Sequence, residues 1–108
     1  ASDYINFYLR ETAEELNKHI TIANIHCSDV FYEEDETLKK KLYDKYGCMA
    51  CEMESFALFH NARKFGKKAA QILTVTDNLI TGERASSENR QNDVMTMIEI
   101  AMESVIKL

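Results

Sequence analysis

The chain has 108 residues, of which 45% are hydrophobic and 29% are charged, and its 13 basic and 18 acidic residues give a formal net charge of −5. This composition is typical of a globular domain, and the length predicts a single domain over residues 1–108. No hydrophobic run is long enough to cross a membrane, and an acidic balance without a Lys/Arg cluster argues against a nucleic-acid-binding surface. Three cysteines are too few for a disulfide scaffold, so the composition favours a reducing cytoplasm.

The first residues lead directly into a helical pattern, without the charged and hydrophobic regions of a signal peptide. Ser2 or Asp3 is expected to cap a helix whose hydrophobic residues recur every three or four positions as far as Ile20. A β-branched run over residues 20–25 then predicts a strand. A chain that starts in a helix in this way is expected to begin inside a larger protein.

Three elements are expected in the middle of the chain. A charged helix covers about residues 35–46, and Gly47 is placed to end it. A short hydrophobic run over residues 48–53 predicts a buried strand, and residues 55–65 predict a further helix.

The last part of the chain predicts one more buried strand over residues 68–75, a polar loop over 76–84 and a long helix over about 86–108. The hydrophobic spacing of that helix predicts one buried face, made of Val94, Met97, Ile98, Ala101, Val105 and Leu108. Strands that alternate with helices indicate an α/β fold with a mainly parallel sheet. With no proline and only three glycines, the chain has no glycine-rich loop that would wrap a phosphate.

Cys48 and Cys51 have the spacing of a redox or zinc pair. A lone pair provides only two of the four ligands that zinc needs, and the histidines lack metal-ligand spacing. Residues three apart on a strand point to opposite faces, so the two thiols would not share an ion. We therefore expect buried, unreactive cysteines.

Two carboxylates, Glu52 and Glu54, follow the strand expected over residues 48–53. Ligands of open α/β sheets bind beyond the carboxyl ends of the strands, where a carboxylate can accept hydrogen bonds from neighbouring sugar hydroxyls. Alternatively, the pair is a charge at the N-terminus of the following helix, with Glu54 satisfying the helix dipole. Spacing alone favours the second interpretation.

Asp77 follows the strand expected over residues 68–75, and Arg90 lies thirteen residues later. An Asp with an Arg partner can act as a tuned acid, whereas the alternative is an Asp that caps a turn and a solvated Arg. Phe31 and Tyr32 form an aromatic pair in a polar loop. Such a pair stacks on a flat ligand or packs the loop onto the core.

Taken together, these segments resemble the C-terminal half of the bacterial-type, hexameric purine nucleoside phosphorylases. The resemblance covers essentially the whole chain. The Glu-Met-Glu element is shared with uridine phosphorylases and methylthioadenosine nucleosidases, whereas the Thr-Asp pair followed by Arg favours the purine phosphorylase branch. The motifs occur in the order Ser28-Asp29-Val30-Phe31-Tyr32, Cys51-Glu52-Met53-Glu54-Ser55, Phe65-Gly66-Lys67-Lys68-Ala69, Thr74-Val75-Thr76-Asp77 and Glu88-Asn89-Arg90-Gln91, followed by residues 97–104.

The resemblance implies a three-layer α/β/α nucleoside phosphorylase-like fold with a central mixed sheet, of which this chain is the C-terminal part. The activity implied is phosphorolytic cleavage of purine (deoxy)ribonucleosides to the free base and (deoxy)ribose 1-phosphate, in purine salvage. Inorganic phosphate is then the co-substrate, and no metal or organic cofactor is implied. The family also implies a cytoplasmic homohexamer built as a trimer of dimers.

Several residues match positions of the family's base pocket. Phe31 matches the aromatic residue that stacks on the purine, and Ser28 and Cys51 match residues that line the pocket. Thr76 stands where the family usually has Ser, so a hydroxyl is kept and a methyl group is added.

Other residues match the family's ribose site and its catalytic acid. Met53 matches the residue that packs under the ribose, and Glu54 matches the residue that holds the 2′- and 3′-hydroxyls, with Glu52 close by. Asp77 matches the general acid that protonates N7 of the leaving purine. Arg90 matches the arginine that closes onto this acid, and we expect it to engage mainly after substrate binds.

The family's phosphate site lies in the N-terminal half, where a Gly-rich loop and several arginines form it, and a neighbouring subunit adds a histidine and an arginine. None of these segments occurs in this chain. We therefore expect the chain alone to be inactive and to need the missing N-terminal half or a complementary chain. Two alternative functions stay open: a hydrolytic nucleosidase of the methylthioadenosine type, and a non-catalytic nucleoside-binding remnant.

Overall fold

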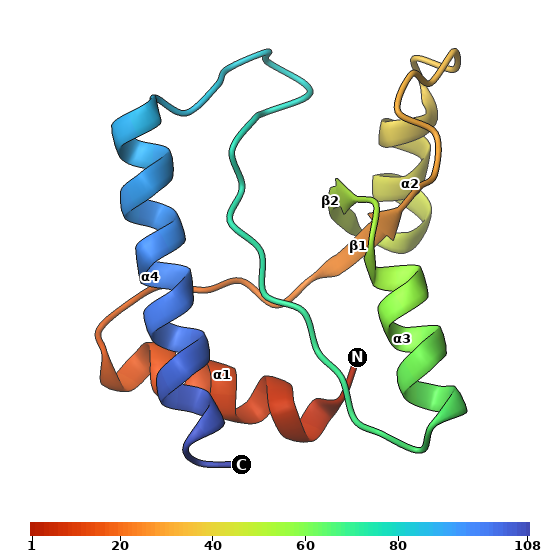
Figure 1. The fold of residues 1–108 in the computed structure, drawn as a ribbon. Coiled ribbons are helices and arrows are strands. Elements are labelled where there is room, and N and C mark those ends of the chain that lie inside the picture. Colours follow the sequence, from red (N-terminus) through yellow and green to blue (C-terminus); the bar gives the residue numbers. More distant parts are fainter. The chain divides into compact units, whose positions relative to one another are not determined.

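The computed structural model describes residues 1–108, which form two compact units. One unit combines Ala1–Ile20 with Lys68–Leu108, and the other is the intervening segment Thr21–Lys67. None of the helices is long and hydrophobic enough to span a membrane. The elements follow in the order α1 (Asp3–Glu15), β1 (Asn24–Cys27), α2 (Leu38–Tyr46), β2 (Cys48–Glu52), α3 (Ser55–Lys64) and α4 (Ser87–Val105) (Figure 1).

Helix α1 begins where the sequence predicts and ends earlier. The Ser2 hydroxyl accepts a hydrogen bond from the backbone N–H of Ile5 at 3.4 Å, which confirms Ser2 as the N-cap. The helix ends because Asn17 adopts a φ of 54°. Asn tolerates this left-handed conformation better than most residues, and it commonly follows a helix end. The predicted continuation to Ile20 is therefore wrong.

The core of the first unit lies between α1 and α4. It consists of Leu9, Ala13 and Ile100, which are 8%, 1% and 1% exposed. Residues Ile5, Leu16, Ile20, Ala70 and Ile72 pack around it. Three buried hydrophobic side chains are few for a chain of this length, so each of them matters to stability.

Helix α4 begins after Ser86, whose hydroxyl accepts a hydrogen bond from the N–H of Asn89 at 3.1 Å. Its buried residues are Ile100 and Ser104, whereas Val105 is 62% exposed. Ser104 is buried at little cost because its hydroxyl donates to the carbonyl of Ile100 at 2.6 Å. The buried face predicted from hydrophobic spacing is therefore wrong at Ile98, which is exposed, and in the last turn, and it misses Ile100.

The second unit contains a β–α–β arrangement in which β1 and β2 pair in parallel. Gly47 ends α2 with a φ of 66°, as predicted, and its N–H donates to the carbonyl of Tyr43 at 2.8 Å. The strand predicted over residues 20–25 lies further along the chain, because pairing with β2 decides which residues form the strand. The paired residues are Asn24 with Cys48, Ile25 with Ala50, His26 with Cys51 and Cys27 with Glu52.

Strand β2 is not buried on both faces, so the prediction of a buried strand is wrong. Its residues alternate: Cys48, Ala50 and Glu52 are half-buried, whereas Met49 and Cys51 are exposed. The sheet has only two strands, and α2 packs beside β2. One face of the strand is thus partly covered and the other stays open.

Residues 68–75 do not form the third strand that the sequence predicts. The segment is an extended loop in Figure 1. The carbonyl of Ala69 accepts a hydrogen bond from the N–H of Ser2 at 2.7 Å. The backbone groups of residues 72–75 make no hydrogen bond. A strand needs a partner for these groups, and none is present. The α/β class is confirmed, with a parallel sheet of two strands.

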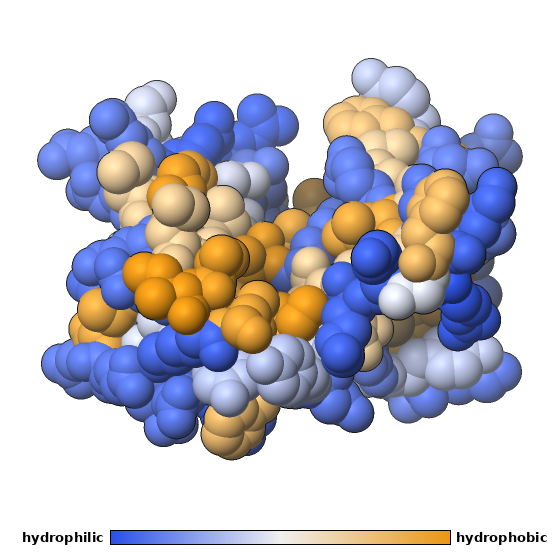
Figure 2. All heavy atoms as spheres, turned by 60° about the horizontal axis from the view of Figure 1, so that its bottom comes forward, coloured by the Kyte–Doolittle hydropathy of each residue, from blue (hydrophilic) through white to orange (hydrophobic).

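Many hydrophobic side chains stay at the surface of both units. Figure 2 shows them gathered in exposed patches between hydrophilic regions. Phe56, Val75 and Ile106 are 75%, 68% and 79% exposed. Large exposed hydrophobic patches on a folded chain typically mark surfaces that contact other protein segments.

We expect the substitution Ile100→Ala to lower the free energy of unfolding by about 2–5 kcal/mol, because it removes buried methylene groups from a core of three residues. Urea denaturation of the purified protein measures this change. Ile106→Ala is the matched control, since Ile106 is 79% exposed. Equal effects of the two substitutions would contradict the assignment of Ile100 to the core.

Candidate functional site

The second unit brings five of the predicted site residues to one edge of the sheet. Because β1 and β2 are parallel, their carboxyl ends meet at the same edge. Ser28 follows β1 directly, and its N–H donates to the carbonyl of Glu52 at 3.0 Å. Cys51 and Glu52 end β2, and residues 53–54 form the short link to α3. This edge is where α/β proteins commonly bind ligands.

The two acidic side chains at this edge have different surroundings. The Glu52 carboxylate is half-buried and accepts hydrogen bonds from the N–H groups of Glu54 and Ser55 at 2.8 and 2.7 Å. Glu54 is exposed, and its Oε2 accepts one hydrogen bond, from the N–H of Met53 at 3.1 Å. Its Oε1 makes no hydrogen bond within the chain. The Glu54 carboxylate therefore keeps room for an external donor.

Ser55 also belongs to this arrangement, although it is not among the predicted site residues. The residue is 6% exposed, and its hydroxyl donates to Oε1 of Glu52 at 2.5 Å. The signal in the sequence is a hydroxyl residue three positions after an acidic residue, at the start of a helix. The expectation that Glu54 satisfies the start of the following helix is wrong, because Glu52 accepts the N–H of Ser55 and the Glu54 side chain makes no capping hydrogen bond. Glu54 is exposed instead.

The cysteines do not form a metal or redox pair. Cys48 is half-buried and Cys51 is exposed, and all three thiols are free. No group of three or more metal-ligating side chains is present. The expectation of buried cysteines is wrong, because the face of β2 that carries Cys51 is open. Cys27 lies close to α3, where its sulfur accepts a hydrogen bond from the N–H of Phe56 at 3.4 Å.

Phe31 lies in the irregular segment between β1 and α2, which starts at the same edge of the sheet. Its ring is 75% exposed and makes an edge-to-face contact with Tyr32 at a centroid distance of 4.9 Å. The Ser28 hydroxyl fixes the start of this segment by accepting a hydrogen bond from the N–H of Val30 at 3.0 Å. The ring is therefore open to a flat ligand and does not pack the segment onto the core.

Asp35 fixes the other end of this segment. Its carboxylate accepts hydrogen bonds from the hydroxyl and the N–H of Thr37 at 2.6 and 2.9 Å, and Lys41 lies 3.1 Å away. The hydroxyl of Thr37, followed by its N–H and by Lys41, lowers the pKa of Asp35 to about 2.

The first unit carries the remaining predicted residues, Thr76, Asp77 and Arg90. Asp77 is exposed and lies opposite Arg84 in a single antiparallel bridge, and the Thr76 hydroxyl lies 3.4 Å from its Oδ2. Arg90 is exposed in the first turn of α4, and its N–H donates to the carbonyl of Ser86 at 2.8 Å. No ion pair joins Asp77 to Arg90, so the structure does not bring the predicted acid and its partner together.

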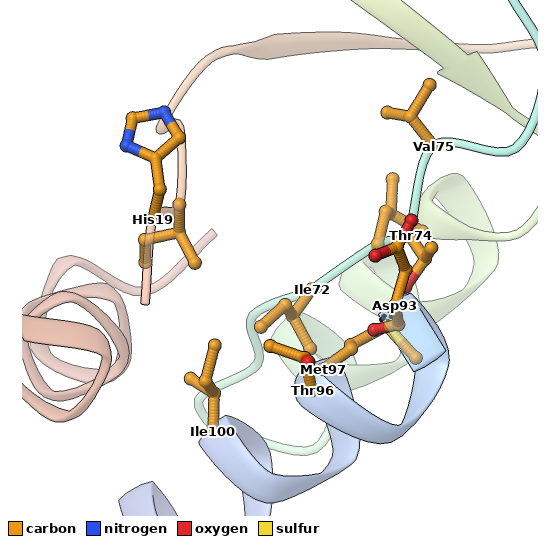
Figure 3. A pocket seen from close by; sticks show the side chains of 10 residues that line it. His19, Ile72, Thr74, Val75, Asp93, Thr96, Met97 and Ile100 are labelled. Atoms are coloured by element: carbon orange, nitrogen blue, oxygen red, sulfur yellow. Dashed lines mark hydrogen bonds between the residues drawn. The ribbon is translucent and has the colours of Figure 1, made fainter. Parts of the chain in front are cut away.

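A cavity of about 290 Å³ lies in the first unit, between the 72–75 segment and α4 (Figure 3). Its lining is mixed hydrophobic and polar, and the Thr74 hydroxyl lies 3.4 Å from the sulfur of Met97. Neither Asp77 nor Arg90 lines it, so it is not the predicted catalytic site. The lining residues are His19, Ile20, Ile72, Leu73, Thr74, Val75, Asp93, Thr96, Met97 and Ile100.

The family model described as the phosphorylase superfamily matches residues 3–108. The chain belongs to the phosphorylase superfamily. Among similar proteins of this superfamily, purine nucleoside phosphorylases of the DeoD type from Anoxybacillus flavithermus and Geobacillus stearothermophilus are each 40% identical over 106 residues. These alignments cover 94% of the chain and 44% of each relative. A DeoD-type enzyme from Bacillus cytotoxicus is 43% identical over 97 residues, which cover 90% of the chain and 41% of that relative.

The chain thus spans less than half the length of these relatives. The similarity confirms the resemblance to bacterial-type purine nucleoside phosphorylases. It extends over both compact units, since the matched residues 3–108 include the edge of the sheet and the Asp77 loop.

We expect the Asp35 carboxyl group to titrate near pH 2 in the folded protein, compared with an ordinary pKa of 3.8. Because the folded-state pKa is the lower one, this carboxylate stabilises the fold above about pH 4, and its contribution is lost as the pH falls towards 2. Carboxyl-carbon NMR measures the titration. Thr37→Val removes the hydroxyl that contributes most to the lowered pKa of Asp35, so the titration midpoint should move to higher pH. A midpoint near 3.8 in the unsubstituted protein would contradict the hydrogen bonding described.

Proposed function

We propose that this chain is part of a purine nucleoside phosphorylase. Such an enzyme cleaves the N-glycosidic bond of purine (deoxy)ribonucleosides, with phosphate as the attacking nucleophile. The products are the free base and (deoxy)ribose 1-phosphate, as in purine salvage. The observation that carries the proposal is the exposed Glu54 carboxylate, whose Oε1 has no partner in the chain, at the edge of the sheet next to Ser28. The relatives that are 40–43% identical are purine nucleoside phosphorylases, which supports the substrate class.

In this proposal the second unit binds the nucleoside. Glu54 accepts hydrogen bonds from the 2′- and 3′-hydroxyls of the ribose, since a carboxylate can accept from two neighbouring donors. Met53, which is 44% exposed, offers a hydrophobic contact beneath the sugar. The open Phe31 ring stacks on the purine, and Ser28 and Cys51 line the base pocket.

Asp77 is the acid in this proposal. Phosphate oxygen forms a bond to C1′ as the bond from C1′ to N9 breaks, and the electron pair of that bond moves onto the purine. Asp77 donates its proton to N7, so the base leaves neutral, and such proton transfer typically contributes about 10²–10⁴-fold in rate. Thr76 lies beside Asp77 with its hydroxyl 3.4 Å from Oδ2. Arg90, which has no ion pair, closes on Asp77 after the nucleoside binds and assists proton donation.

The phosphate site is supplied from outside residues 1–108 in this proposal. The relatives are more than twice as long as the matched region, which leaves ample chain to carry it. The partner is the complementary N-terminal half, and the assembly is a homohexamer in the cytoplasm, a location that three free thiols favour. No metal or organic cofactor takes part; inorganic phosphate is the co-substrate.

The run over residues 72–75 supports the need for a complementary segment. Its backbone groups make no hydrogen bond, and Val75 is 68% exposed. Unpaired N–H and C=O groups along a hydrophobic run are a ready template for another strand. A segment that pairs with it would also cover the open cavity beside α4.

We expect the amides of Ile72, Leu73 and Val75 to exchange rapidly with deuterium in the 108-residue chain alone, because no hydrogen bond protects them. When the complementary half is present, the same amides should become protected by at least about tenfold through strand pairing. Hydrogen-exchange mass spectrometry measures both states. The amide of Ile100 in α4 is the internal reference. Unchanged exchange at residues 72–75 would contradict pairing at this run.

The activity is tested in the parent polypeptide that contains residues 1–108. We expect release of hypoxanthine from inosine only when phosphate is present. Glu54→Ala should lower kcat/KM by about 10²- to 10⁴-fold, because it removes two hydrogen bonds to a charged acceptor, each of which contributes about 1.5–3 kcal/mol. Glu36→Ala is the matched control, since Glu36 is exposed and lies outside the site residues. A coupled assay for the free base gives the rates.

Three outcomes would overturn the proposal in distinct ways. Base release that does not depend on phosphate would identify a nucleosidase. Nucleoside binding without any cleavage would identify a non-catalytic remnant. Full activity of Glu54→Ala would remove Glu54 from the ribose site while leaving the reaction in place.

A further inference from the structure

Glu52 and Glu54 are separated by one residue, but their carboxylates differ in the number of hydrogen bonds they accept from the chain. Three hydrogen bonds converge on the Glu52 carboxylate: Oε2 accepts from the N–H groups of Glu54 and Ser55, and Oε1 accepts from the Ser55 hydroxyl at 2.5 Å. A carboxylate offers about four acceptor positions, so these contacts use most of them. Glu52 therefore has little capacity left for a bidentate contact with a sugar.

The Glu52 carboxylate acts in place of an N-cap side chain at the start of α3. Glu54 occupies the N-cap position of α3, but its own side chain makes no capping hydrogen bond. The first N–H groups of a helix need acceptors from outside the helix, and the Glu52 carboxylate serves the first of them at Ser55. A negative charge at this end is further stabilised by the helix dipole. Ser55 is 6% exposed, so losing these acceptors would leave buried donors without a partner.

The same residue also joins the two strand ends. The main-chain carbonyl of Glu52 accepts the N–H of Ser28 at 3.0 Å, while its side chain holds the N–H of Glu54. The segment that begins at Ser28 and the link that carries Glu54 are thus fixed to one residue. The direction of the exposed Glu54 carboxylate depends on this link.

We propose that Glu52 is a positioning residue, whose carboxylate holds the link from β2 to α3 so that Glu54 is presented to the sugar. The inference rests on the proposed function for the identity of the ligand. It assigns Glu52 no direct contact with substrate. The capping hydrogen bonds themselves are properties of the folded chain and do not depend on the ligand.

Two substitutions separate a positioning role from a sugar contact. Glu52→Gln keeps a carbonyl oxygen that accepts from the two N–H groups, and its amide can donate to the Ser55 hydroxyl, so the link is retained. Glu52→Ala removes every side-chain acceptor and leaves the main-chain carbonyl in place. In the parent polypeptide we expect Glu52→Ala to lower kcat/KM for inosine by about 10²-fold, because small misplacements of a binding group are costly. Glu52→Gln should retain at least about ten times the kcat/KM of Glu52→Ala.

A double-mutant cycle with Glu54→Ala gives the readout that a general loss of structure would not. If Glu52 acts through Glu54, then Glu52→Ala should have little further effect on kcat/KM once Glu54 is removed. Additive losses, or a Glu52→Gln variant as impaired as Glu52→Ala, would instead indicate direct substrate contact and overturn the proposal.

A measurement without substrate keeps the test valid if Glu52→Ala folds poorly or the enzyme assay fails. Amide hydrogen exchange at Glu54 and Ser55 should be slow in the unsubstituted protein and in Glu52→Gln. Rapid exchange in both would overturn the capping role. Protected amides in a protein that does not cleave inosine would contradict the proposed function alone and leave the role of Glu52 in the fold intact.

Discussion

Strands β1 and β2 run parallel, so the chain leaves both of them at the same edge of the sheet. Parallel pairing requires a crossover, and α2 provides it. The hydrogen bond from the N–H of Ser28 to the carbonyl of Glu52 extends the pairing just beyond the strands. This arrangement sets the position of three candidate binding groups, because each belongs to a segment that starts at that edge. They are the hydroxyl of Ser28, the aromatic ring of Phe31 and the carboxylate of Glu54.

The edge combines a satisfied carboxylate with an unsatisfied one. Glu52 is half-buried and surrounded by donors from its own chain, whereas Glu54 is exposed and has an oxygen without a partner. The helix α3 needs an acceptor at its start, and the proposed ribose site needs one that is free for a ligand. Two acidic residues at a spacing of two satisfy these separate requirements, because the first turns back to the helix and the second turns to solvent.

Local chemistry in the sequence was sufficient to predict the helices and the polar residues at the strand ends. Ser2 and Gly47 mark helix boundaries through their own hydrogen bonds and dihedral angles, which depend only on neighbouring residues. The strands were less predictable, because a strand is defined by its partner. Residues 20–25 and 68–75 both have the composition of strands, but the pairing that forms is between β1 and β2, and residues 68–75 have no strand partner. The burial of Ser104 was also hidden, since its hydroxyl is satisfied inside α4 and hydrophobic spacing does not record it.

The first unit is made from both ends of the chain, and the second is a continuous insertion between them. The contact of the Ser104 hydroxyl with the carbonyl of Tyr8 spans 96 positions, as does that of Lys107 with Glu11. The α1–α4 pair therefore closes a long loop, at an entropic cost that grows with the length of the intervening chain. The β–α–β segment needs only short closures. Collapse of this segment shortens the loop that the pairing of α1 with α4 must close, so we expect β1, α2 and β2 to assemble before α1 packs against α4.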